Sequence, residues 1–385
     1  METQGERAAS AGAKGIDAAR LERELTAMWR ANAVTGADGA PTGMTRACVL
    51  NLVVYTSERD DRTALDAVLD EVFERNPCRA LILRAGRAEE PASIKAYVST
   101  RCQAAGRGRK LVCGEQVTIE ARGRAVETAG SAVAPLLVPD VPVFLWWKDV
   151  PHYEDNLFDR LVGMADRVVI DSASFDHPRA DLLRLAHLVG ERTRFNLSDL
   201  NWCRLASWRT LVASFWDVAD YRAYLDRIER VEIEYTWPEG AALELAPKAA
   251  LTLGWMASAL KWEIEPAGTS VENRETRFLL RAGERRIDVT ARAQPDAGAH
   301  KSTVLTALKL TAPDAEFHVA FRPEGTKLET GTRIGADRHV VGRVLAYEPR
   351  SEGARLNEEL SFLTRDRVYE RSLNFAARLL DTLRS

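Results

Sequence analysis

The stretch PLLVPDVPVFLWWKDVPH (135–152) decides how the first half of this chain folds. Pro139 and Pro142 lack backbone N–H groups, so regular β structure is expected only after them. The next five residues, VFLWW (143–147), form an unbroken apolar run. Such a run is typical of a central strand covered on both faces, because a half-solvated strand alternates apolar and polar residues.

The end of this predicted strand is a candidate contact site. Successive side chains of a strand point to opposite faces, so Trp146 and Trp147 are expected to enter different layers. Lys148, Asp149 and His152 follow the strand. Open parallel sheets place ligand and partner sites at this carboxyl edge.

Working outward, the flanking sequence predicts an α/β domain over residues 45–176. A β-rich segment, a helix with one apolar stripe and a second apolar strand make a βαβ unit, which is right-handed and parallel by strong precedent. Polar residues follow three of the strands, at Thr56, Lys148 and Asp171, and are expected along one edge of the sheet. The predicted strands are 46–55, 78–83, 94–102, 111–121 and 167–170, and the predicted helices are 60–75, 124–137 and 156–164.

The remaining sequence predicts a different architecture. Residues 1–44 are expected to contain a disordered start (1–15), a docking helix and a linker, and residues 177–226 a helical joint. Beyond residue 226 the apolar period becomes two, as in VEIEYTW (231–237), which indicates an antiparallel sheet in an α+β domain ending at residue 385. The final helix is expected to bury a stripe formed by Tyr369, Leu373, Ala376, Leu380 and Leu383.

Composition limits the function. The 385 residues exceed the size of one core, so two domains are expected. A net charge of −3 gives no electrostatic argument for binding nucleic acid or an anionic membrane. The N-terminus has no apolar core of signal-peptide length and no segment has the length to span a membrane, so we expect a cytoplasmic protein.

Motifs for familiar chemistry are missing from the sequence. It lacks G-x-G-x-x-G, G-x-x-x-x-G-K-[ST], G-x-S-x-G and H-E-x-x-H, and its six histidines have no metal-ligand spacing. We therefore predict no cofactor and no metal. Asp171 and Ser172 would serve acid/base or hydrogen-bonding chemistry, but the favoured interpretation is that they cap the next segment.

A second candidate patch lies in DLNWCRLASWR (199–209). Tryptophan and arginine are the residue types most enriched in protein-binding hot spots. A helical joint packing within the chain explains the same residues equally well. The residues concerned are Asp199, Asn201, Trp202, Arg204, Trp208 and Arg209.

The five cysteines include one candidate redox pair. In a symmetric hairpin around QAAGRGRK (103–110), Cys102 and Cys113 lie directly opposite, at a Cα separation that suits a disulfide. In a cytoplasmic chain, two reduced thiols are the favoured expectation.

Five segments, taken together, resemble the OpcA family, the glucose-6-phosphate dehydrogenase assembly proteins. They are NPCRALIL (76–83), VCGEQVTIEARG (112–123), PLLVPDVPVFLWWKD (135–149), VVIDSASF (168–175) and SDLNWCRLASWR (198–209). The resemblance implies a non-catalytic partner that promotes assembly and activation of glucose-6-phosphate dehydrogenase, and it provides no catalytic residues.

The leading hypothesis is therefore an assembly factor that binds this dehydrogenase. Its predicted contacts are Trp146, Trp147, Lys148, Asp149, Asp171 and Ser172 at the sheet edge, with the 199–209 residues as a second patch. The alternative is a sugar-phosphate-binding enzyme or sensor that uses Lys148 and backbone N–H groups at the same edge.

Overall fold

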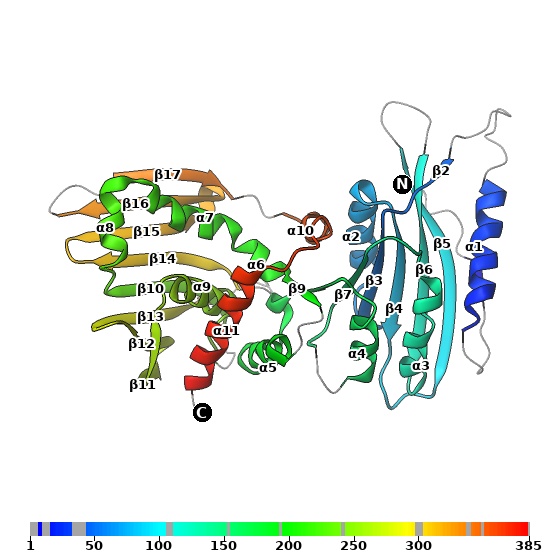
Figure 1. Cartoon of the computed structure of the whole chain (residues 1–385), viewed down its shortest axis with the longest axis horizontal. Helices are drawn as coiled ribbons and strands as arrows, with labels where there is room; N and C mark the ends of the chain where they lie inside the picture. Colours follow the sequence, from blue (N-terminus) through cyan, green and yellow to red (C-terminus); the bar gives the residue numbers. More distant parts are fainter. Residues whose placement is uncertain are drawn as a thin grey trace. The chain divides into compact units, whose positions relative to one another are not determined.

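The computed structural model describes residues 7–9, 16–32, 44–104, 111–151, 155–191, 195–239, 243–296, 303–335, 340–347 and 350–383. The chain divides into two compact units (Figure 1). Unit 1 comprises Met1–Ile170, Arg192–Ser198 and Arg350–Arg365. Unit 2 comprises Asp171–Glu191, Asp199–Pro349 and Asp366–Ser385.

Unit 1 is built on a mostly parallel sheet. In spatial order its strands are β1 (Arg7–Ala9), β5 (Ser93–Ala104), β6 (Leu111–Arg122), β4 (Cys78–Ala85), β3 (Leu50–Ser57), β7 (Val143–Trp147), β8 (Arg167–Ile170) and β9 (Asn196–Asp199), with β2 (Met44–Arg46) paired to β6. The pairs from β6 to β8 are parallel, and the β5–β6 hairpin is antiparallel. Because β3 and β8 flank β7, the predicted central strand is confirmed.

Helices pack on this sheet. They are α1 (Ala18–Asn32), α2 (Arg62–Arg75), α3 (Ala125–Ser131) and α4 (Asn156–Val162), with a 3-10 turn η1 (Ala134–Leu136). Helix α10 (Glu352–Glu359) packs on α2. The predicted βαβ unit is β3–α2–β4, and its two strands are parallel. α2 begins at Asp61, whose side chain accepts a hydrogen bond from Thr63 N, and it buries Leu65, Leu69 and Phe73.

Helix α1 belongs to unit 1 and lies beside β5 (Figure 1). It buries Leu21, Leu25 and Met28. A charged cluster between the helix and the sheet joins strands β4 and β6. Arg79 Nη2 of β4 lies 2.5 Å from Glu115 Oε2 of β6, and the two side chains are only 4% and 3% exposed. The helix therefore docks on its own sheet, an alternative that the sequence leaves open.

The carboxylates of this cluster have several donors. Arg79 also pairs with Glu22 of α1, Trp29 Nε1 donates to Glu115 Oε1, and Arg46 Nε lies 2.9 Å from the same oxygen. Removing one partner of a buried ion pair leaves the other charge without compensation, which is costly. This cluster therefore fixes where α1 lies on the sheet.

Unit 2 contains an eight-stranded sheet. In spatial order the strands are β11 (Glu263–Glu272), β12 (Glu275–Ala282), β13 (Arg285–Asp296), β10 (Arg230–Pro238), β14 (Leu305–Ala312), β15 (Ala315–Arg322), β16 (Lys327–Ile334) and β17 (Val340–Ala346). The predicted antiparallel pairing is confirmed for the other described strand pairs of this sheet, but β10 and β13 are parallel. The chain between them includes α9 (Pro247–Ala259), β11 and β12, which provide the crossover that parallel strands require.

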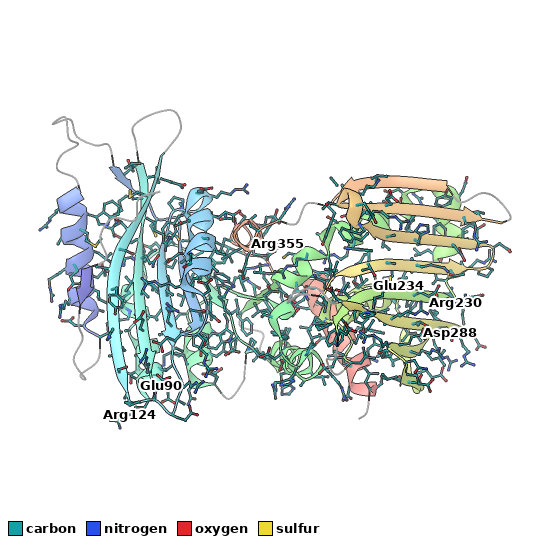
Figure 2. The ribbon with its side chains drawn as sticks, turned by 180° about the vertical axis from the view of Figure 1, so that it is seen from behind. Glu90, Arg124, Arg230, Glu234, Asp288 and Arg355 are labelled. Atoms are coloured by element: carbon teal, nitrogen blue, oxygen red, sulfur yellow. A yellow bond between two sulfur atoms is a disulfide. The ribbon has the colours of Figure 1, made fainter. Side chains whose placement is uncertain are left out.

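The two faces of this sheet differ in polarity. Along β10, Val231, Ile233, Tyr235 and Trp237 are buried, as the period-two pattern predicts. The opposite face carries interleaved charges, such as Glu234 with Arg292 and Glu232 with Lys309. Figure 2 labels Arg230, Glu234 and Asp288 on the adjacent strands β10 and β13. The charge pairs on this second face are typical of a surface in contact with water.

Helices and short turns complete unit 2. The helices are α5 (Pro178–Glu191), α6 (Leu200–Arg204), α7 (Ala206–Ser214), α8 (Arg222–Leu225), α9 and α11 (Arg367–Thr382), and the 3-10 turns are η2 (Ser172–Ser174), η3 (Phe215–Asp217), η4 (Ala219–Tyr221) and η5 (Pro323–Gly325). α9 and α11 cross closely at Gly254, where an added Cβ would lie 2.1 Å from Ser372 O. Glycine is therefore required at this crossing.

Several sequence expectations need correction. Arg7–Ala9, expected to be disordered, pairs with β5 as a short strand, and the rest of 1–15 lies outside the described residues. The sequence patterns do not predict β9, β11, β16, β17 or α10. Residues 350–365, placed by prediction in the second domain, belong to unit 1, where Asn357 Nδ2 of α10 donates to Glu71 O of α2 at 2.8 Å.

Candidate functional site

The end of β7 is an aromatic cluster in the core of unit 1. The Trp147 ring stacks on Tyr55 of β3, with centroids 3.7 Å apart and planes 8° apart, and it meets Phe158 of α4 edge to face at 4.9 Å. Trp146 and Trp147 are 0% and 1% exposed. Burial, followed by the charges of Asp149, Asp155 and Asp60, raises the pKa of the Tyr55 hydroxyl.

Lys148 and Asp149 continue from this cluster toward the surface. The Lys148 ammonium lies 4.3 Å from the centre of the Trp146 ring and 3.2 Å from Glu352 Oε1 of α10. Asp149 is exposed, and its carboxylate accepts a hydrogen bond from Val150 N at 2.7 Å. His152 lies outside the described residues.

In unit 2 the structure brings Asp171, Ser172, Asp199 and Asn201 together. Ser172 donates to Asp199 through its backbone N (3.0 Å) and its Oγ (2.6 Å), and Asn201 N donates at 2.8 Å. Asp171 accepts a hydrogen bond from Ala173 N at the start of η2, and Asp199 caps α6 in the same way. The capping interpretation of Asp171 is confirmed.

Tyr369 of α11 completes the cluster, donating its hydroxyl to Asp199 Oδ2 at 3.2 Å. The helical spacing of Tyr369 predicts a place in an apolar stripe and gives no role to its hydroxyl. A buried tyrosine hydroxyl usually finds a hydrogen-bond partner, and this is the signal that was missed. Burial raises the pKa of Asp199 to about 6, and the charge of Asp171 adds to the effect, although hydrogen bonds from Ser172 and Asn201 lower it.

The two arginines of the second patch are half-buried, and each contacts a side chain of unit 2. Arg204 makes a two-pronged ion pair with Asp171, at 2.6 and 2.7 Å. The Arg209 guanidinium lies 3.4 Å from the centre of the Trp202 ring and donates to Trp202 O. Trp202 Nε1 donates to Asp366 at 3.0 Å. Trp202 and Trp208 are buried, at 4% and 2% exposure.

These arrangements provide capping and packing rather than a reactive group. The Ser172 hydroxyl is buried and bonded to a carboxylate, so a substrate cannot reach it in this conformation. No group of three or more His, Cys, Asp or Glu side chains that would hold a metal ion occurs among the described residues. Within the same part of the chain, no helix is both long and apolar enough to cross a membrane.

The cysteine pair has the predicted register. Cys102 of β5 lies opposite Cys113 of β6, with Cα atoms 4.0 Å apart, and the two are joined by a disulfide. Reduced thiols were the favoured expectation, but the structure has the bonded form, because the hairpin register holds the two residues face to face. Redox control at this pair stays a prediction.

Comparisons with known proteins identify relatives along most of the chain. A family model described as the glucose-6-phosphate dehydrogenase subunit N-terminal domain matches residues 69–187, and its C-terminal counterpart matches residues 195–373. A protein of Nostoc punctiforme is 31% identical over 81% of this chain and 67% of its own length, and one of Synechocystis is 30% identical over 81% and 66%. Both carry names that assign them, provisionally, to the OxPP cycle as OpcA proteins.

Solved structures show weaker likeness. A 3-ketoreductase from Actinomadura kijaniata has a TM-score of 0.46 and 16% identity, covering 86% of this chain and 96% of that one. An aldose-aldose oxidoreductase from Caulobacter crescentus has a TM-score of 0.46 and 9% identity, covering 86% and 95%. These values are too low to support a conclusion about activity. The two family models and the relatives, by contrast, show that the chain belongs to the OpcA family of glucose-6-phosphate dehydrogenase assembly proteins.

Proposed function

We propose that this chain is a non-catalytic assembly factor that binds glucose-6-phosphate dehydrogenase and stabilises its active oligomer or conformation. The observation that carries the proposal is the match of both family models, each described as a domain of a glucose-6-phosphate dehydrogenase subunit. The burial of the Ser172 hydroxyl is consistent with a role in binding rather than in chemistry.

Activation by such a partner requires differential binding. A partner shifts a conformational equilibrium only by the difference between its affinities for the two states. A tenfold shift toward the active state needs about 1.4 kcal/mol, which is within what one well-buried side chain contributes to an interface. The difference in affinity between the two states therefore needs only a few well-ordered contacts.

An exposed apolar pair in unit 1 supports a contact of this kind. Phe362 and Leu363 are 57% and 48% exposed on the turn that follows α10. The turn is held by its backbone, because Asn196 Nδ2 donates to Leu363 O and Arg167 Nη1 donates to Thr364 O, both at 2.7 Å. A preorganised apolar contact loses little conformational entropy on binding.

The charged residues predicted from the sequence are retained as proposed contacts. Lys148 and Arg209 each lie over a buried tryptophan ring, Trp146 and Trp202 respectively. Trp146 and Trp202 would then act by positioning these charges, since the rings of Trp146, Trp147, Trp202 and Trp208 are covered within the chain. Asp149, Asp171 and Arg204 are the other proposed surface contacts, and Ser172, Asp199 and Asn201 would support them from below.

The proposal is tested by mixing the purified chain with the dehydrogenase of the same organism. We expect a complex in size-exclusion chromatography and, in enzyme assays with the chain added, a higher kcat or a lower KM for glucose 6-phosphate. If no complex forms and the kinetic constants do not change, the proposed function is wrong.

Matched variants locate the contact. Phe362→Ala and Leu363→Ala are expected to weaken the complex at least about tenfold, because truncating a buried apolar anchor costs about 1.4 kcal/mol or more. Val49→Ala is the control, since Val49 is an equally exposed apolar residue of unit 1, at 51%. Equal affinities for all three variants would remove the 362–363 pair from the interface while leaving the function intact.

The alternative, a sugar-phosphate-binding enzyme or sensor, depends on a free cation at the end of β7. The Lys148 ammonium lies 3.2 Å from the Glu352 carboxylate, which would compete with a phosphate for it. Calorimetry of the isolated chain with glucose 6-phosphate distinguishes the two readings. Tight, saturable binding would favour the alternative.

A further inference from the structure

The strand order of unit 1 is typical of sheets that bind dinucleotides, although the sequence has no dinucleotide-binding motif. Six strands run in the order β6-β4-β3-β7-β8-β9. Numbered along the chain within this set, that is 3-2-1-4-5-6, the order of doubly wound sheets that bind dinucleotides. The order reverses between β3 and β7, and in such sheets the pyrophosphate lies at the N-terminus of the helix that follows the first strand. Here that helix is α2.

The turn before α2 does not fit a pyrophosphate. It reads TSERDDR (56–62), with no glycine to let a phosphate approach the backbone. Asp61 already accepts the hydrogen bond of Thr63 N at 2.8 Å, and Asp60 Oδ2 accepts from Ser57 N at 3.2 Å and from Thr56 Oγ1. Thr63 N at this helix end and Ser57 N in the turn thus donate to the chain's own carboxylates, whose charge repels an anion.

Two arginines at the neighbouring strand ends contact the turn, which itself contains the exposed Arg59. Arg84, at the end of β4, is largely buried, and its Nη2 donates to Glu58 O and Asp60 O, each at 3.0 Å. Arg122, at the end of β6, pairs with the Glu58 carboxylate at 2.7 Å. Both arginines therefore stabilise the acidic turn. Their guanidinium groups are oriented toward atoms of the turn rather than toward an incoming phosphate.

The side chains of Glu58 and Arg122 pack closely against Gly86. Gly86 follows β4, and a Cβ added there would lie 2.6 Å from Arg122 Cγ and 2.8 Å from Glu58 Oε2. Glu58 N also donates to Ala85 O at 2.8 Å, which extends the backbone ladder past the end of the strands. The acidic turn is therefore joined to the sheet edge by a backbone hydrogen bond.

We infer that the dinucleotide site implied by this strand order is closed by the chain's own acidic turn, residues 58–61, so that neither NADP(H) nor inorganic pyrophosphate binds there. This goes beyond the proposed function, because it states which ligands the sheet edge excludes whether or not a dehydrogenase is bound. The chain has the strand order of a dinucleotide-binding sheet, but its own carboxylates lie where the pyrophosphate would bind.

The test is calorimetry of the full chain with NADP⁺ and with inorganic pyrophosphate, each to millimolar concentration. We expect no saturable heat from the wild-type chain. The double variant Asp60→Asn/Asp61→Ser removes two negative charges while keeping a capping hydroxyl at position 61 and an acceptor at position 60. It is expected to bind pyrophosphate saturably, at least about tenfold more tightly than the upper limit that the wild-type titration sets, a difference of about 1.4 kcal/mol or more.

The control variant Asp220→Asn/Asp226→Asn makes the same change in net charge in unit 2 and is expected to behave like the wild type. Circular dichroism verifies that each variant is folded. Saturable binding of either ligand to the wild-type chain overturns the inference. So does a folded Asp60→Asn/Asp61→Ser variant that binds pyrophosphate no better than the control. Co-purification with the dehydrogenase uses neither ligand. A failure of the proposed function can therefore be distinguished from a failure of this inference.

Discussion

Replacing Asp199 by asparagine tests the electrostatic consequence of burying its carboxyl group. In the wild-type chain, burial raises the pKa of Asp199 from 3.8 to about 6. Asparagine has the same shape: its oxygen accepts the backbone N–H bonds of Ser172 and Asn201, and its amide donates to the hydroxyls of Ser172 and Tyr369. The variant is therefore expected to fold and to lack this titration.

The sign and size of the effect follow from proton linkage. Between pH 3.8 and pH 6 the folded chain holds a proton on Asp199 that the unfolded chain has lost, so this group's contribution to stability falls as the pH rises. A difference of about 2.2 pKa units, at 1.36 kcal/mol each, corresponds to about 3 kcal/mol. Relative to Asp199→Asn, the wild type should lose about this much free energy of unfolding from pH 4 to pH 7.

Urea unfolding of both proteins across this pH range, followed by circular dichroism, measures the difference. Carboxylates with lowered pKa values, such as Glu275, Glu316 and Glu329, contribute with the opposite sign, but they are common to both proteins and cancel. A free-energy difference that does not change with pH would refute the assignment, because Asp199 would then titrate alike in the folded and unfolded chains.

Three further predictions concern the two sheets and their helices. Arg79→Met should lower the free energy of unfolding by about 3–5 kcal/mol in urea titrations, because it leaves the Glu115 carboxylate buried without its main partner, and adding Glu115→Leu should restore part of the loss. Gly254→Ala should lower the melting temperature in calorimetry, because the new methyl group would overlap the backbone of α11; an unchanged temperature would contradict the close crossing. Thiol titration of the denatured chain should find three free thiols without reductant and five with it, since Cys102 and Cys113 form the disulfide; five in both conditions would contradict the bonded pair.

The sequence predicts strands well where the apolar pattern of a segment has only one structural interpretation. The VFLWW run at 143–147 has no polar position, so it identifies a strand with both faces covered, and β7 has these bounds. The period-two pattern of VEIEYTW likewise identifies β10 and its buried face. Alternation does not reveal the direction of the neighbouring strand, and for that reason the parallel β10–β13 pair was missed.

The candidate site was harder to predict, because its contacts join distant parts of the chain. Asp199 and Tyr369 are 170 positions apart, and only the packing of α11 brings the hydroxyl to the carboxylate. Tryptophan is frequent both in hot spots and in cores, so composition alone cannot separate the two. Trp146 and Trp202 lie in cores, and the charged side chains above them, Lys148 and Arg209, reach the surface.

The order in which unit 1 is completed has a consequence for how the protein is made. Its last segment, Arg350–Arg365, carries α10 and is synthesised only after nearly all of unit 2. An emerging chain would therefore present α2 without α10, and its Glu71 carbonyl without the Asn357 amide, until the ribosome has passed residue 365. A gene cut at the predicted boundary after residue 176 would yield a first fragment that lacks β9 and α10. Separate expression of the two halves is thus expected to give an aggregation-prone product, whereas coexpression offers a route to reassembly.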